Sequence, residues 1–284
     1  INSNNDLHLI YWQRDKKGDV KAPMGVVTHP FNQEMSDSLP LIKKLPLILQ
    51  FGRFAKKTIK ELEPDFLIVL HSTTAFTIRH LLFNKYYGRY IFDFRDVTYE
   101  RKYSFYKECI AQIVKHSAIT FTSSDAYRQF LPQCDKILTS HNFLIEDLYK
   151  RKQYKACRNK LKIQPIKIAF WGLLRHYDLN KLIIERLAND SRFELHYYGR
   201  AQGVMLELMK ECASLYNNFF FHGEYKPCDR DDFAMSMDLI HNLYSNEDTN
   251  MPFAMSNKYY DGLMYYIPQL CMRGSYMGEK CSLY

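Results

Sequence analysis

Glycine and proline are scarce in this chain of 284 residues, which contains 11 glycines and 10 prolines. No segment is a low-complexity run, and hydrophobic residues make up 46% of the chain. This composition excludes disorder over most of the length, because enough apolar residues are present to form a core. No apolar run reaches the roughly 18 residues that a membrane-spanning helix needs, and no signal peptide opens the chain. The sequence begins at Ile1 rather than Met, so we expect it to start inside a longer protein.

Metal-binding and disulfide patterns are also missing. The seven cysteines are irregularly spaced, and neither a CxxC pair nor a Cys/His cluster with zinc spacing occurs. We therefore predict a cytoplasmic protein with reduced thiols and no metal. The GxSxG motif of serine hydrolases is absent, and no cysteine lies in a recognisable nucleophile turn. These absences argue against a serine or cysteine hydrolase.

The net charge is +8, and the lysines and arginines are scattered along the chain. A basic balance suits an anionic partner such as a nucleotide, a phospholipid surface or a nucleic acid. A solvated face is the favoured explanation for the short basic runs at 150–152 and 155–162. We predict no nucleic-acid binding, because helix-turn-helix, zinc and RNP patterns are absent.

Short apolar segments alternate with helical patterns along most of the chain. The predicted strands are 7–12, 65–72, 89–96, 118–124, 135–143, 166–172, 193–200, 217–225, 237–245 and 267–272. The predicted helices are 46–64, 74–87, 103–117, 125–133, 178–189, 203–215, 229–236 and 256–266. This order predicts an α/β protein in which helices cover both faces of parallel sheets. We predict two Rossmann-like doubly wound domains, 1–145 and 166–284, joined by a charged linker with some helix at 146–165.

Polar residues cluster directly after several predicted strands. Examples are the HSTT sequence that begins at His71, the pair Arg95 and Asp96, and His141 with its neighbour Asn142. Ligands of open α/β sheets bind at these carboxyl ends of strands. The strand at 65–72 is a continuous apolar run, which predicts that both of its faces are buried.

The sequence SNKYYDGLMYYIP at 256–268 has the features of a helix that starts at an anion site. Ser256 is a good N-cap residue, and the free N–H groups of a first helical turn attract anions. Lys258 adds a positive charge, and Asp261 lies on a neighbouring face, four residues after Asn257. A phosphate beside Lys258 and a ribose diol donating to Asp261 would together make a nucleotide. The alternative is an ordinary capped helix with an internal Lys–Asp pair.

Three glycines follow predicted strands of the second domain, namely Gly172, Gly199 and Gly223. Backbone at such a glycine can approach a ligand closely. Arg175 comes shortly after the first glycine and is a candidate to bind a diphosphate. Each feature is weak alone, and their order along the chain is what favours a nucleotide site.

This order of motifs resembles the donor-binding half of GT-B glycosyltransferases. The segments that carry the resemblance are a strand followed by WG, a strand followed by YYGR, and then FFFHGEY, DLIHNLYSNE and SNKYYDGLMYYIPQL. The most similar subset is the bacterial family 4 type of capsule and surface-polysaccharide assembly, in which a PNKLYE-A-L-x-x-G-I-P segment binds the nucleotide sugar. RYIFDFRD, SAITFTSSDAYRQFL and HNF resemble the end of the acceptor half. The resemblance covers most of the chain, and SNKYYDGLMYYIP is its most specific part.

The resemblance implies transfer of a sugar from a nucleoside diphosphate sugar to a hydroxyl of a glycan or a lipid-linked glycan. Configuration would be retained, and neither a metal nor another cofactor would be needed. Asn257 and Lys258 would hold the diphosphate, and Asp261 would replace the family's glutamate on the ribose. Gly172 and Arg175 would line the diphosphate entrance.

The remaining residues that the resemblance implicates are Gly199, Asp96 and His141. Gly199 would line the base and ribose region. Asp96 would face the cleft between the domains, where it would contact the acceptor or act as a base, and His141 is a second candidate there. During transfer, negative charge would develop on the leaving diphosphate, and positive groups with helix N–H groups would stabilise it.

The chain departs from the family pattern at several places. The family often has two glutamates separated by seven residues, and the first of these positions is Phe253 here. We therefore assign no carboxylate to the sugar, although Glu247 and Asp248 are close in sequence. The first strand and glycine loop of the acceptor half and the last helices of the fold are not visible. The resemblance thus implies a fold that is incomplete at both ends.

Two other functions stay open. A sugar-nucleotide epimerase shares the two-domain plan but needs a convincing acid–base carboxylate pair. A degenerate module would bind the nucleotide sugar without catalysis, which the missing first glutamate favours.

The basic and apolar segment 42–60 is a candidate contact with an anionic inner membrane, and an ordinary helix packed on the sheet explains this segment equally well.

Overall fold

The computed structural model describes residues 5–14, 23–36, 39–143, 145–157, 165–245 and 250–283. The chain forms two compact units, each with its own sheet. Unit 1 comprises Ile1–Thr122 and Arg128–Thr139, and unit 2 comprises Ser123–Tyr127 and Ser140–Tyr284. Within the described ranges, no helix has the length and hydrophobicity needed to cross a membrane.

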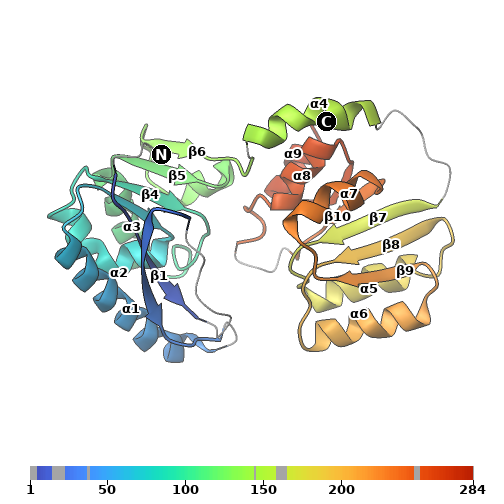
Figure 1. Cartoon of the computed structure of the whole chain (residues 1–284), viewed down its shortest axis with the longest axis horizontal. Helices are drawn as coiled ribbons and strands as arrows, with labels where there is room; N and C mark the ends of the chain where they lie inside the picture. The colour runs from blue at the N-terminus through green and yellow to red at the C-terminus, as the bar shows by residue number, and fades with distance from the viewer. Residues whose placement is uncertain are drawn as a thin grey trace. The chain divides into compact units, whose positions relative to one another are not determined.

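Unit 1 contains a four-stranded parallel sheet in the order β3-β4-β5-β6. Helix α2 connects β3 to β4 and α3 connects β4 to β5, and α2 packs between α1 and α3 (Figure 1). The elements are β1 (Leu7–Gln13), β2 (Val26–Asn32), α1 (Leu41–Leu62), β3 (Leu67–Leu70), α2 (Ser72–Phe83), β4 (Tyr90–Phe94), α3 (Ser104–His116), β5 (Ile119–Thr122) and β6 (Ile137–Thr139). A 3-10 helix (Asp125–Phe130) precedes β6, and its residues up to Tyr127 belong to unit 2. The sequence predicted a longer helix at 125–133, whereas the structure has this short 3-10 helix.

Strand β2 is a feature that the sequence pattern missed. It pairs in parallel with β1 in a separate two-stranded sheet, with Leu7 opposite Val26 and Gln13 opposite Asn32. The segment VVTHPFN contains Pro30, which cannot donate a ladder hydrogen bond and normally argues against a strand. The strand forms because a two-stranded sheet leaves an outer edge on which a missing donor costs little.

The expectation that β3 is buried on both faces is wrong. Val69 is buried, whereas Ile68 and Leu70 are 68% and 53% exposed. The reason is positional: β3 is an edge strand of its sheet, and alternate side chains point to opposite faces. A continuous apolar run therefore does not by itself establish that both faces are covered.

Unit 2 contains a five-stranded parallel sheet in the order β11-β10-β7-β8-β9. The strand order reverses between β7 and β10, and open α/β sheets bind ligands at the carboxyl ends of strands at such a switch point. The elements are α4 (Ile145–Cys157), β7 (Ile166–Trp171), α5 (Tyr177–Leu187), β8 (Phe193–Tyr198), α6 (Val204–Leu215), β9 (Phe219–Gly223), a 3-10 turn (Pro227–Asp229), α7 (Arg230–Met235), β10 (Leu239–Asn242), α8 (Asn257–Tyr265), β11 (Gln269–Cys271) and α9 (Tyr276–Cys281).

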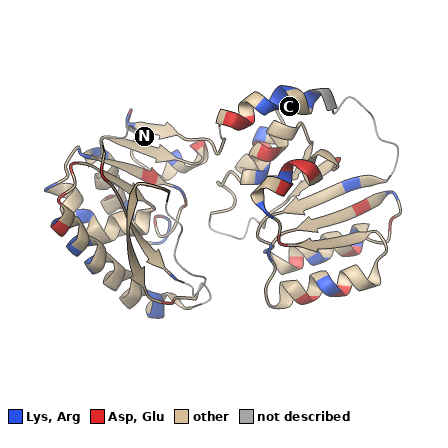
Figure 2. Cartoon of the chain, viewed as in Figure 1, with Lys and Arg blue, Asp and Glu red and all other residues tan. Residues whose placement is uncertain are grey.

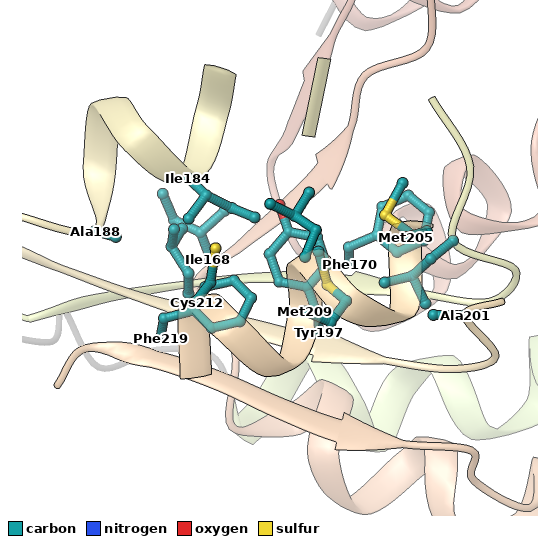
Figure 3. Close-up of a cluster of buried hydrophobic side chains, with 13 residues drawn as sticks. Ile168, Phe170, Ile184, Ala188, Tyr197, Ala201, Met205, Met209, Cys212 and Phe219 are labelled. Carbon is teal, nitrogen blue, oxygen red and sulfur yellow. The ribbon is translucent and has the colours of Figure 1, made fainter. Parts of the chain in front are cut away.

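Hydrophobic cores lie on both faces of the unit 2 sheet, as the sequence predicted for a doubly wound domain. On one face, side chains of β7, β8 and β9 pack against α5 and α6 (Figure 3). This core contains Ile168, Phe170, Leu174, Ile184, Ala188, Leu195, Tyr197, Ala201, Met205, Leu208, Met209, Cys212 and Phe219. On the other face, the alternate residues Ala169 and Trp171 pack against α7 and α8. The α/β fold class is confirmed.

Helix α4 occupies much of the segment that the sequence assigns to the linker, and it packs against α8. The Tyr154 ring lies 4.9 Å from the Tyr265 ring, and Arg151 donates to the carbonyl of Leu263. The acidic residues Glu146 and Asp147 lie in the first turn of α4, and the basic residues follow them along the helix (Figure 2). A segment that is charged in sequence thus forms a helix of unit 2 along residues 145–157.

Candidate functional site

Helix α8 begins where the sequence predicted. Ser256 has extended backbone, and its hydroxyl accepts from the backbone N–H of Tyr259 at 3.2 Å. The same hydroxyl donates to Oδ1 of Asn242, the last residue of β10, at 2.8 Å. The N-cap prediction for Ser256 is confirmed, and the cap also ties the first turn of α8 to the carboxyl end of β10.

Lys258 is a buried cation in the first turn of α8, with 6% of the residue exposed. Its Nζ lies 4.1 Å from the ring centroid of Phe170 and 4.8 Å from that of Tyr244, and it donates to the Tyr244 hydroxyl. Among the residues that the structure describes, no carboxylate forms an ion pair with this ammonium. Buried charges are normally paired, so this site favours an anion.

Asp261 is also buried, one turn further along α8, and its two oxygens have different partners. Oδ2 accepts from Nε1 of Trp171 at 2.8 Å, and Oδ1 lies 3.0 Å from Nη1 of Arg230. Burial raises the pKa of Asp261, and the Trp171 hydrogen bond and the charges of Arg230 and Lys258 oppose this rise. The helix therefore directs Lys258 and Asp261 to different partners, and a ribose would have to use the remaining lone pairs of this carboxylate.

Asn257 is the first residue of α8, and His141 contacts the same helix within unit 2. Asn257 is exposed, and its Oδ1 accepts from Nδ2 of Asn142 at 2.8 Å. Nδ1 of His141 lies 3.0 Å from the hydroxyl of Tyr260. His141 was predicted within the first domain, whereas its contacts place it in unit 2, against α8.

Gly172 and Gly199 directly follow β7 and β8, Gly223 ends β9, and the three glycines form successive turns. The N–H of Gly172 donates to the carbonyl of Tyr198, and the N–H of Gly199 donates to that of Gly223. A Cβ on Gly199 would lie 1.8 Å from the carbonyl oxygen of Gly172, whereas a Cβ on Gly172 would meet nothing within 4 Å. Gly199 is therefore required by the packing of neighbouring turns, and Gly172 borders open space.

Arg175 is exposed in the loop between β7 and α5, and a buried chain of hydrogen bonds holds that loop. Nδ2 of Asn180 donates to the carbonyls of Arg175 and His176, at 2.6 and 3.1 Å. Oδ1 of Asn180 lies 3.2 Å from Nε2 of His241 on β10. The N–H of Leu243 donates to Nδ1 of His241, so Nε2 carries the hydrogen and donates to Asn180. The loop that presents Arg175 is thus fixed to β10.

A polar network behind Asp261 was not predicted from the sequence. Arg230, the first residue of α7, contacts Asp261 and also donates from Nε to the Tyr265 hydroxyl at 3.1 Å. Asp231 accepts from the hydroxyls of Tyr265 and Tyr154. The CDRDDF sequence gave no signal for this role beyond a charged helix start, because the partners lie on α4 and α8.

Unit 1 has its own polar cluster after β3 and β4. His71 caps α2 in a backbone conformation that is rare outside glycine, with φ of 74°, and its Nδ1 accepts from the N–H of Thr73. Burial lowers the pKa of His71, and the charges of Asp96 and Glu100 oppose this. Asp96 is exposed, whereas Glu100 is buried and accepts from the N–H of Thr98 at 2.6 Å. Sequence reasoning noted the polar cluster that begins at His71 but chose only Asp96 as a site residue, and it overlooked Glu100.

Two further predictions concern carboxylates and metals. Glu247 and Asp248, considered for the sugar, lie outside the described residues. Within the described ranges, no group of three or more His, Cys, Asp or Glu side chains is placed to hold a metal ion.

No protein-family model and no curated protein sequence matches this chain, but solved structures resemble it. HepE of Anabaena in complex with UDP-glucose has a TM-score of 0.53 at 11% identity, covering 96% of this chain and 82% of that protein. Sucrose-phosphate synthase from Thermosynechococcus elongatus has a TM-score of 0.64 at 10% identity, covering 94% of this chain and 71% of that protein. A proposed UDP-N-acetylglucosamine 2-epimerase from Listeria monocytogenes has a TM-score of 0.50 at 11% identity, covering 91% of this chain and 68% of that protein.

The fold is of the GT-B type. The predicted pair of Rossmann-like domains therefore agrees with solved structures as well as with the four- and five-stranded parallel sheets of this chain. At these identities the likeness concerns the fold. Membership of family 4 and a role in capsule assembly stay predictions.

Proposed function

We propose that this protein is a glycosyltransferase that uses a nucleoside diphosphate sugar as donor. The observation that carries the proposal is the buried Lys258 ammonium, which has no carboxylate partner among the described residues and lies in the first turn of α8. Ser256 ties this turn to the end of β10, beside the switch point of the sheet. A cation, the positive end of a helix dipole and strand ends together suit a diphosphate.

Each of the surrounding residues has a different role in this proposal. Lys258 neutralises charge on the diphosphate, and Asn257 and Arg175 contact it from the exposed side. Gly172 leaves space for it, because nothing lies within 4 Å of the position of a Cβ there. Asp261 accepts from the ribose with lone pairs that Trp171 and Arg230 leave available.

The reaction is the transfer of the sugar to a hydroxyl of a glycan or lipid-linked acceptor. Charge develops on the diphosphate as its bond to the sugar breaks, and Lys258 and Arg175 stabilise that charge. We assign acceptor binding to unit 1, where Asp96 and His71 follow adjacent strands. Because Nδ1 of neutral His71 accepts from Thr73, its Nε2 carries a hydrogen and would donate to a substrate oxygen. Retention of configuration and independence of metal stay predictions from the resemblance.

Membrane contact through α1 is the second part of the proposal. Ile42, Leu45 and Leu49 are exposed near the start of this helix, and Arg53, Lys57 and Lys60 are exposed nearer its end (Figure 2). An apolar and basic face of this kind suits an anionic lipid surface. We place the protein at the inner face of the cytoplasmic membrane for this reason.

A thermal-shift screen tests the donor site. The chain is heated with UDP, GDP, CDP or ADP and with their sugars, as wild type, as Lys258→Met and as the exposed-lysine control Lys210→Met. One diphosphate is expected to raise the Tm of the wild type and of the control by mass action. Methionine keeps the packing on Phe170 but removes the charge, so binding to Lys258→Met is expected to be at least about ten-fold weaker, since a hydrogen bond to a charged group contributes about 1.5–3 kcal/mol.

Equal shifts in wild type and Lys258→Met would show that the nucleotide binds elsewhere, and no shift with any nucleotide would contradict the donor site. Two other functions remain distinguishable. Conversion of a nucleotide sugar without an acceptor would indicate an epimerase, a function that the fold of the Listeria protein keeps open. Nucleotide binding without transfer or conversion would indicate a degenerate module.

A further inference from the structure

Cys271 and Cys281 bring their sulfur atoms together in the last part of unit 2. Cys271 is the final residue of β11 and Cys281 is the final residue of α9. Their Sγ atoms are 3.2 Å apart, and both side chains are partly buried. Of the six cysteines whose side chains the structure describes, only these two are in sulfur contact. A disulfide has an S–S distance of about 2.05 Å, so closure requires a movement of roughly 1 Å.

The two thiols differ in reactivity. The hydrogen bond from Cys271 lowers the pKa of Cys281, and the same interaction together with burial raises the pKa of Cys271. Thiolates are the nucleophiles of thiol chemistry. Cys281 is therefore the attacking group, and its side chain is partly exposed to solvent.

Helix α9 is in contact with the first turn of α8. Sδ of Met277, in α9, lies 3.3 Å from the backbone nitrogen of Ser256 and 3.7 Å from Nδ2 of Asn242. Ser275 caps α9 by accepting from the N–H of Gly278. A covalent bond between β11 and α9 would therefore fix the helix that supports Ser256, the cap of α8.

We propose that Cys271 and Cys281 form a redox-active dithiol that closes to a disulfide and pins α9 to β11. The oxidant is a low-molecular-weight disulfide of the glutathione class. The Cys281 thiolate attacks one sulfur of this reagent, a mixed disulfide forms, and one thiolate leaves. Cys271 then loses its proton and attacks the Cys281 sulfur, which expels the second thiolate. The protein loses two hydrogens, and one reagent disulfide is reduced to two thiols.

Thiol counting and peptide mapping on the native protein test the proposal. After incubation with oxidised glutathione, two of the seven cysteines are expected to become unreactive together. Mass spectrometry is expected to show the peptides of Cys271 and Cys281 linked, with the loss of two hydrogens. The Tm is expected to rise by about 5 °C, because the cross-link constrains the unfolded chain. A reductant should reverse both changes.

The matched variants are Cys271→Ser, Cys281→Ser and, as a control, the exposed Cys228→Ser. Cys271→Ser is expected to keep a glutathionyl group on Cys281 and to lose the Tm rise, whereas Cys228→Ser should respond like wild type. Absence of the linked peptide in oxidised wild type, or a link that forms only after denaturation, would overturn the proposal. A linked protein with an unchanged Tm would show that α9 is not pinned. None of these measurements uses a nucleotide, so their result is separate from that of the proposed function.

Discussion

At the scale of single residues, unit 2 has a cation and a neutral imidazole close together in its interior. His241 is fully buried, contacts Asn180 and Leu243, and has the ring of Phe170 at 5.4 Å. Burial and the charge of Lys258 lower the pKa of His241 to about 3. The imidazole therefore stays neutral, which keeps it in the tautomer that holds the Arg175 loop.

This pKa has a consequence for stability. Between about pH 6.5 and pH 3 the unfolded chain binds a proton at residue 241 and the folded chain does not, so the free energy of unfolding falls as the pH falls. His241→Gln, which can still donate to Asn180, is expected to reduce this slope by up to about 1.4 kcal/mol per pH unit. Urea unfolding between pH 7 and pH 4.5 measures the slope of the unfolding free energy against pH.

The exposed-histidine variant His80→Gln is the control and should keep the wild-type slope. Some slope should remain in His241→Gln, because the pKa values of His71, His196 and His222 are also lowered by burial. An identical slope in His241→Gln and wild type would contradict the assignment.

At the scale of elements, glycine residues let the turns at the carboxyl ends of β7, β8 and β9 approach one another closely. Gly199 has φ of 132° and its Cα faces the carbonyl of Gly172, while Gly223 has φ of 74° and open space around it. Both conformations favour glycine, but only the first combines backbone strain with a close approach.

Gly199→Ala is expected to cost at least about 3 kcal/mol of unfolding free energy, because the new methyl group would overlap a backbone oxygen that cannot rotate away. Gly223→Ala is the matched control and is expected to cost about 1–2 kcal/mol, from the left-handed backbone alone. Chemical denaturation of the two variants gives the comparison. Equal costs would show that the turns can separate without penalty.

At the scale of the whole molecule, each unit has a parallel sheet of four or five strands, and unit 1 adds one long helix with an apolar and basic face. Replacement of Lys43, Lys44, Lys56 and Lys57 by glutamate is expected to abolish binding to anionic liposomes, because each basic residue near such a surface contributes about 1 kcal/mol. Co-sedimentation at low and high salt measures this.

The control for this charge reversal is Lys181→Glu with Lys210→Glu, on exposed positions of α5 and α6. It should leave liposome binding nearly unchanged. Retained binding in the α1 variant, or equal loss in the control, would remove α1 as the membrane surface.

The sequence by itself determined the alternation of strands and helices, the N-cap at Ser256 and the glycine turns after strands. These features are local, since a cap, a turn and a hydrophobic period each depend on residues a few positions apart. Strand β2 was not predicted because Pro30 obscured its local signal. The exposure of Ile68 and Leu70 could not be predicted either, because it depends on which element covers β3.

Only the tertiary structure decided which groups meet. The partners of Asp261 come from β7 and α7, the rings around Lys258 come from β7 and the segment after β10, and the two thiols come from β11 and α9. Burial and partners at these sites depend on contacts between residues far apart in the chain. The sequence left open whether Lys258 and Asp261 bind a phosphate and a ribose or form an internal pair, whereas packing gave each side chain its own partners.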